Sequence, residues 1–124
     1  VRGKTIAILG LTFKPNTDDM RDAPSLALIT ALQDAGAQIR AYDPQGMNAA
    51  ASMTSHVFFA DNAYACVENS DALVIVTEWD AFRALDLGRV RSLLKTPIVV
   101  DLRNIYRPAE MRAKGFDYVS VGRP

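Results

Sequence analysis

Five short apolar runs, separated by stretches with helical spacing, are the feature that most limits what this chain can fold into. The runs cover residues 5–9, 38–43, 72–76, 97–101 and 117–121. They are rich in β-branched residues and nearly continuous rather than alternating, which is typical of strands buried on both faces of a parallel sheet. A weaker run at Val57-Phe58-Phe59 indicates a short edge strand.

The intervals between the runs predict helices. Pro24 is suited to the first turn of a helix, and an apolar stripe follows it over residues 26–32. Gly36 and Gly115 each stand just before a predicted strand, where we expect a left-handed helix cap. Asp61 is expected to cap the next helix.

This alternation with short connections predicts a single doubly wound α/β domain, Rossmann-like, with a parallel sheet and helices on both faces. The length of 124 residues fits one domain, and 49% hydrophobic residues exclude a disordered chain. Fourteen basic residues balance fourteen acidic ones, so we expect no nucleic-acid partner. The apolar runs are shorter than the roughly 20 residues of a membrane span, so we expect no membrane partner. The chain begins without Met, and we expect it to be a domain of a longer protein.

The residues that most often carry chemistry do not form a catalytic group in this sequence. The single cysteine, Cys66, cannot form an internal disulfide, which fits a cytoplasmic protein. No Lys, Arg or His stands at helical spacing to lower its pKa, so we expect a packed thiol. His56 is the only histidine. We therefore predict no catalytic residue and no metal site in this chain.

Ligands of parallel α/β sheets bind beyond the carboxyl ends of the strands. The loop after the first run has only Gly10 where a dinucleotide site has G-x-G-x-x-G. It does carry Lys14 and Arg21, which either reach an anion or remain solvated. Phe13 in the same loop either plugs the core or lies against a flat ligand.

Arg103 follows the run 97–101 and is expected at the same edge as Lys14. We expect these two cations to come from adjacent strand ends, where they bracket a site for a diphosphate. The alternative for Arg103 is a local ion pair with Asp101.

Three further residues follow strand ends and are interpreted as structural. Asp43 occupies the place of a ribose-binding acid, but without the glycine pattern we favour a turn that begins at Asp43-Pro44. Trp79 and Phe82 are predicted to pack rather than bind.

Several motifs, in order, resemble the C-terminal domain of the UDP-glucose/GDP-mannose dehydrogenase family. The first is Gly-Leu-Thr-Phe-Lys-Pro-Asn-Thr-Asp-Asp-Met-Arg-Asp-Ala-Pro-Ser at 10–25, and others lie at 41–44, 76–82, 100–106 and 115–123. The resemblance covers essentially the whole chain. Segments 77–79 and 101–106 look most like the branch that uses UDP-glucose. Branches that use GDP-mannose or UDP-N-acetylmannosamine are near relatives.

The resemblance implies an NAD-dependent oxidoreductase that oxidises a sugar C6 alcohol twice, to UDP-glucuronate, with two NAD+. In that family an N-terminal NAD-binding domain and a central dimerisation region precede a C-terminal UDP-binding domain. We therefore expect residues 1–124 to be that last domain, from a cytoplasmic homodimer. The nucleophilic cysteine belongs to the preceding part, so Cys66 does not match it, and the chain alone is expected to be inactive.

The resemblance also implies roles for four residues. Phe13 and Lys14 match positions that contact the UDP-sugar. Arg103 matches an arginine that reaches the substrate across the subunit interface. Arg21 matches an arginine that contacts NAD bound mainly to the other domain. These matches favour the interpretation of Lys14 and Arg103 as a diphosphate bracket.

Three other function classes are weaker alternatives. A phosphorylated receiver domain needs an acidic pair after the first strand and an Asp after the third. The sequence has Gly10-Leu11-Thr12 and Thr77-Glu78-Trp79 at these two places. An independent NAD-binding domain lacks its glycine pattern. A non-catalytic interaction module predicts that nucleotide-sugars do not bind.

Overall fold

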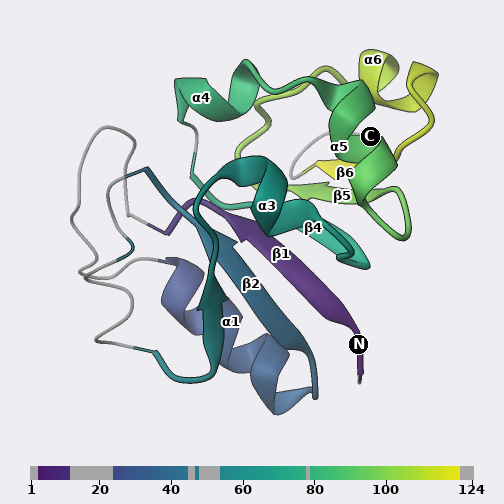
Figure 1. Cartoon of the computed structure of the whole chain (residues 1–124). Helices are drawn as coiled ribbons and strands as arrows, with labels where there is room; N and C mark the ends of the chain where they lie inside the picture. Colours follow the sequence, from purple (N-terminus) through teal and green to yellow (C-terminus); the bar gives the residue numbers. More distant parts are fainter. Residues whose placement is uncertain (1–2, 12–23, 45–46, 48–53, 78, 121–124) are drawn as a thin grey trace.

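The computed structural model describes residues 3–11, 24–44, 47, 54–77 and 79–120. This part of the chain contains one six-stranded parallel sheet in the order β3-β2-β1-β4-β5-β6 (Figure 1). The strands are β1 Thr5–Leu9, β2 Gln38–Tyr42, β3 Val57–Phe59, β4 Ala72–Ile75, β5 Ile98–Asp101 and β6 Asp117–Ser120. This is the Rossmann strand order, with a reversal between β1 and β4, and it confirms the predicted fold class.

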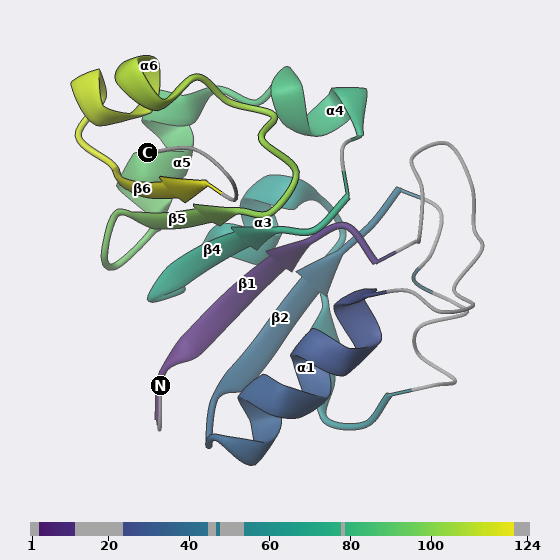
Figure 2. The same cartoon turned by 180° about the vertical axis from the view of Figure 1, so that it is seen from behind.

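Helices lie on both faces of the sheet, as predicted. Helix α1, Pro24–Asp34, lies behind the sheet in Figure 1 and in front of it in Figure 2, whereas α3, Ala63–Val67, lies on the opposite face. The remaining helices are α4 Asp80–Arg83, α5 Leu87–Leu93 and α6 Pro108–Ala113. Right-handed crossovers explain the division, because the connections before and after the reversal run in opposite directions along the sheet.

Each face of the sheet has its own apolar core. Ile6, Ile8 and Ile39 pack with Ile29 of α1 on one face. On the other, strand residues pack against side chains of α3, α5 and α6, which include Cys66, Val90 and Met111. Burial of one such aliphatic side chain stabilises the fold by about 1.5–3 kcal/mol, so both halves of the sheet contribute to stability.

The predicted strand positions are confirmed, and Val57–Phe59 forms an edge strand at one end of the sheet. Gly36 and Gly115 have positive φ, 94° and 89°, as expected of left-handed caps. The prediction that Asp61 caps α3 was wrong by one residue. Asn62 is the N-cap, and its side chain accepts a hydrogen bond of 2.8 Å from the Ala65 amide.

No helix in the described ranges has the length and apolar character needed to cross a membrane.

Candidate functional site at the carboxyl edge of the sheet

The loops after β1 and β4 meet closely at the point where the strand order reverses. Gly10 follows β1 directly with φ at +98°, and a Cβ added to it would lie 2.5 Å from the backbone nitrogen of Thr77. Only glycine fits this approach without displacing the chain after β4. The single glycine of the first loop therefore serves packing between two loops, and this packing accounts for it without a bound phosphate.

Asp43, which follows β2, is fully buried at this edge. Its carboxylate accepts hydrogen bonds from the Leu11 amide at 2.7 Å and from the Trp79 indole at 3.1 Å. Pro44 lies in a turn, so the predicted turn is present. The turn does not explain why the Asp43 carboxylate is buried. Asp43 ties the segments after β1, β2 and β4 together. Trp79 and Phe82 are buried, which confirms that they pack.

Asp101, the last residue of β5, is also fully buried and organises the loop that follows it. One carboxylate oxygen accepts the Arg103 amide at 3.0 Å. The other accepts the amides of Ile105 at 2.8 Å and Tyr106 at 3.1 Å, and the Tyr118 hydroxyl at 2.7 Å. The structure thus uses Asp101 to hold the backbone of its own loop.

Arg103 is exposed on this loop, and the following residue, Asn104, adopts a left-handed conformation with φ at +57°. The backbone therefore bends just after Arg103, between the amides that Asp101 holds. A guanidinium is permanently charged and offers a planar set of donors that matches phosphate oxygens. Arg103 thus places a cation at the carboxyl edge of the sheet.

The far end of the loop is fixed by Tyr106, which is buried and whose hydroxyl donates to the Phe82 carbonyl at 2.5 Å. Burial, followed by the negative charge of Asp101, raises the pKa of Tyr106 above its usual value. The phenol therefore remains a hydrogen-bond donor at physiological pH.

Of the four predicted site residues, Arg103 lies in the described part of the chain; Phe13, Lys14 and Arg21 lie outside it. The expectation that Lys14 and Arg103 follow adjacent strands was wrong, because β4 stands between β1 and β5. At about 4.8 Å per strand, the two strand ends are roughly 10 Å apart rather than 5 Å. The two strands are separated because the chain crosses over at the reversal point and places β4 beside β1. Local sequence patterns do not reveal this crossover.

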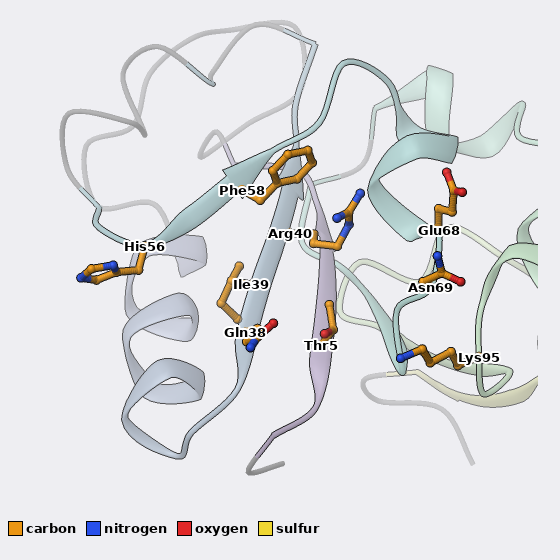
Figure 3. Close-up of a pocket in the computed structure, with 9 residues that line it drawn as sticks. All are labelled: Thr5, Gln38, Ile39, Arg40, His56, Phe58, Glu68, Asn69 and Lys95. Carbon is orange, nitrogen blue, oxygen red and sulfur yellow. The ribbon is translucent and has the colours of Figure 1, made fainter.

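A separate surface pocket of about 640 Å³ lies at the other end of the sheet (Figure 3). Thr5 and Gln38, the first residues of β1 and β2, line it together with Phe58 and Lys95. The Arg40 guanidinium stacks on Phe58, 4.3 Å from the ring centroid, and donates to two carbonyls at the end of α3. Because the strands are parallel, this pocket lies away from the edge that carries Arg103.

Cys66 is fully buried in α3. Burial raises its pKa to about 12, against a smaller lowering by the Arg40 charge. The thiol is thus protonated and inaccessible, as predicted for a packing residue. Within the described ranges, no three His, Cys, Asp or Glu side chains are grouped so that they could hold a metal ion.

Comparison with known proteins agrees with this geometry. The family model described as UDP-glucose/GDP-mannose dehydrogenase family, UDP binding domain, matches residues 7–108. The chain belongs to this family.

Two relatives and one solved structure illustrate the family match. The chain is 56% identical over its full length to a UDP-glucose 6-dehydrogenase of Rhizobium meliloti, and 46% identical over 99% of its length to one of Pseudomonas aeruginosa. It spans 28% of each of these proteins. An NDP-N-acetyl-D-galactosaminuronic acid dehydrogenase structure from Methanosarcina mazei superposes with a TM-score of 0.86 at 31% identity. That match covers 98% of this chain and 25% of the other.

Sequence reasoning missed the buried acceptors of this family member. An Asp at the end of an apolar run, followed by a short polar loop, is a signal for a side chain that accepts local amides, and it applies to Asp101. The partners Tyr118 and Trp79 stand 17 and 36 positions from their carboxylates, and no local pattern connects them.

Proposed function

We propose that this chain is the UDP-sugar-binding domain of an NAD-dependent UDP-glucose 6-dehydrogenase, which converts UDP-glucose to UDP-glucuronate by two hydride transfers to two NAD+. The observation that carries the proposal is the 56% identity, over the whole of this chain, to part of a UDP-glucose 6-dehydrogenase, together with the match to the family's UDP binding domain. The exposed Arg103 on a loop held by Asp101 supplies a matching cation at the ligand-binding edge.

In this proposal Lys14 and Arg103 contact the diphosphate, and Phe13 contacts the same UDP-sugar. Hydrogen bonds between a charged donor and an anion contribute about 1.5–3 kcal/mol each. Binding energy from the nucleotide, which does not react, then positions the sugar C6 for hydride transfer.

The described residues do not fit a dinucleotide at the reversal point of this domain. Thr77 fills the space beside Gly10, and Asp43 is buried and occupied by Leu11 and Trp79 instead of facing a ribose. We therefore assign NAD mainly to another domain of the parent protein, with Arg21 as the contact from this chain. The catalytic cysteine is assigned to that other part as well, since Cys66 is buried.

The proposal includes the organisation of the parent. Residues 1–124 form its C-terminal domain, after an NAD-binding domain and a dimerisation region, in a cytoplasmic homodimer. Arg103 reaches the substrate of the partner subunit.

The first test is kinetic, in the full-length enzyme that carries this domain. Lys14→Ala and Arg103→Ala should each raise the KM for UDP-glucose about 10- to 100-fold, the size of one lost charge-assisted hydrogen bond. Lys114→Ala removes an exposed cation beyond α6 and is the matched control, with unchanged KM. A wild-type kcat/KM for either site variant would refute the role given to that residue.

A second test separates the substrate classes. Amide chemical shifts of the 124-residue chain are followed during titration with UDP, UDP-glucose, GDP-mannose and NAD. Uridine ligands should shift the resonances of Phe13, Lys14 and Arg103 most strongly. A preference for GDP-mannose would move the assignment to that branch, and no response up to millimolar ligand in both the chain and the full-length enzyme would favour an interaction module.

A second candidate substrate is an N-acetylated nucleotide-sugar such as UDP-N-acetylmannosamine. The TM-score of 0.86 to a dehydrogenase named for an N-acetylated sugar favours it. Turnover by the full-length enzyme with UDP-glucose and UDP-N-acetylmannosamine side by side distinguishes the two.

A further inference from the structure

The loop after β5 is built around a carboxylate instead of around an apolar side chain. Asp101 accepts three backbone amides, from Arg103, Ile105 and Tyr106, on both sides of the bend at Asn104. A fully buried carboxylate is costly unless donors surround it, so these bonds constrain the loop strongly. The conformation of the Arg103 backbone is thereby tied to the position of one buried side chain.

Tyr118 of β6 holds that carboxylate from the neighbouring strand. Its hydroxyl donates to Asp101 at 2.7 Å, and the Tyr106 carbonyl lies 3.2 Å from the same hydroxyl. A phenol has one proton, and the shorter contact with the charged oxygen is the stronger one. Tyr118 is buried and pairs in register with Val99 of β5, two residues before Asp101.

We propose that Asp101 and Tyr118 are positioning residues for substrate binding, acting through Arg103. This inference rests on the proposed function, in which Arg103 contacts the UDP diphosphate. A guanidinium on an unconstrained loop loses conformational entropy when it binds an anion, and a loop that is already held loses less. The hydrogen bonds from Tyr118 to Asp101 and from Asp101 to the Arg103 amide therefore set the affinity for the nucleotide-sugar, although Tyr118 and Asp101 do not contact it.

The test is Tyr118→Phe in the full-length enzyme, because phenylalanine keeps the ring and removes only the hydroxyl. The expected result is a rise of about threefold to tenfold in the KM for UDP-glucose, the effect of one hydrogen bond, with KM for NAD and kcat unchanged. A merely structural role would act differently: it would lower the fraction of active enzyme, and hence the apparent kcat, at unchanged KM. Such a result would overturn the inference.

Tyr64→Phe is the matched control. Its hydroxyl accepts the Asp86 amide at 2.9 Å, so this change also deletes one phenol hydrogen bond, but one that does not involve Asp101. It should leave the KM for UDP-glucose unchanged. An equal rise in both variants would contradict a specific role for Tyr118.

A double-mutant cycle with Arg103→Ala tests the route of the effect. If Tyr118 acts through Arg103, Tyr118→Phe should have no further effect on KM in the Arg103→Ala background. Additive effects would overturn the inference while leaving the proposed function intact. An unchanged KM in Arg103→Ala alone would instead refute the substrate role of Arg103, and the inference with it.

Asp101→Asn provides a second variant that keeps the side-chain shape. It replaces one accepting oxygen by an NH2 group, which cannot accept, and it removes the charge from the other oxygen. At least one of the four hydrogen bonds is therefore lost and the others are weakened, so the KM for UDP-glucose should rise more than in Tyr118→Phe. A smaller rise in KM than that of Tyr118→Phe would contradict the proposal that Tyr118 acts through Asp101.

Discussion

Asp43 and Asp101 are both buried carboxylates at the same edge of the sheet, but they hold different parts of the backbone. Asp43 follows β2, and Asp101 is the last residue of β5. Asp43 takes its donors, the Leu11 amide and the Trp79 indole, from the segments after two other strands. Asp101 takes three amides from its own loop. The first pulls separate segments together, whereas the second shapes one loop and leaves Arg103 exposed.

The difference teaches where this fold can bind a ligand. Around Asp43 and Gly10 the edge is closed by packing between the segments after β1 and β4. Around Asp101 a charged side chain is presented on a constrained loop. In a Rossmann domain the reversal point usually holds the ligand. Here the described residues after β1 and β4 pack against each other at that place, and the exposed Arg103 stands on the loop after β5.

Asp101→Ala should produce the largest loss of stability. It leaves three backbone amides, of which that of Tyr106 is buried, and the buried Tyr118 hydroxyl without their acceptor, and each lost partner costs about 1–3 kcal/mol. We expect the free energy of unfolding in urea to fall by about 4 kcal/mol or more. Asp117→Ala, which removes an exposed carboxylate from β6, is the control and should change it by less than about 0.5 kcal/mol. Equal effects would break the comparison.

Asp43→Ala should cost about 2–4 kcal/mol, because the Leu11 amide and the Trp79 indole, both in the described part of the chain, lose their acceptor. The chain has one tryptophan, so Trp79 fluorescence reports on this site alone. We expect its emission maximum to shift, since the indole loses a charged partner. An unchanged spectrum together with wild-type stability would mean that Asp43 does not hold these segments together.

Cys66 sharpens the comparison as a buried acid that stays neutral, and at neutral pH its protonation should have no effect on stability, the smallest of these effects. Its pKa is raised by burial to about 12, from 9.0, so the folded state keeps the proton that the unfolded state loses. Stability is therefore unaffected below pH 9 and falls between about pH 9 and 12, by about 1.4 kcal/mol per pH unit. Urea unfolding across this range should show a steeper fall in wild type than in Cys66→Ala. Parallel pH profiles would contradict this assignment.

Local patterns in the sequence were sufficient for the fold class and for most element positions. The runs that became β1, β2, β4, β5 and β6 are apolar because both of their faces are covered, and that requirement is written into consecutive residues. Gly36 and Gly115 were likewise predictable, because a helix that ends just before a strand needs a left-handed residue. The resemblance of the motifs also identified the family.

The candidate site was only partly predictable. Arg103 was predicted as a site residue from its place after an apolar run, and the structure places it on an exposed loop. The role of Asp101 was not predicted, because its Tyr118 donor comes from another strand. The cap of α3 was placed one residue early, at Asp61, since neighbouring Asp and Asn residues are both good caps.

The sequence by itself determined which segments are strands and helices, because hydrophobic periodicity is a property of neighbouring residues. Only the tertiary structure decided that β4 lies between β1 and β5, that Asp43 binds Trp79, and that Tyr118 holds Asp101. These contacts join residues 17 to 36 positions apart. Crossovers between strands bring them together, and burial makes each polar group take whichever partner lies within reach.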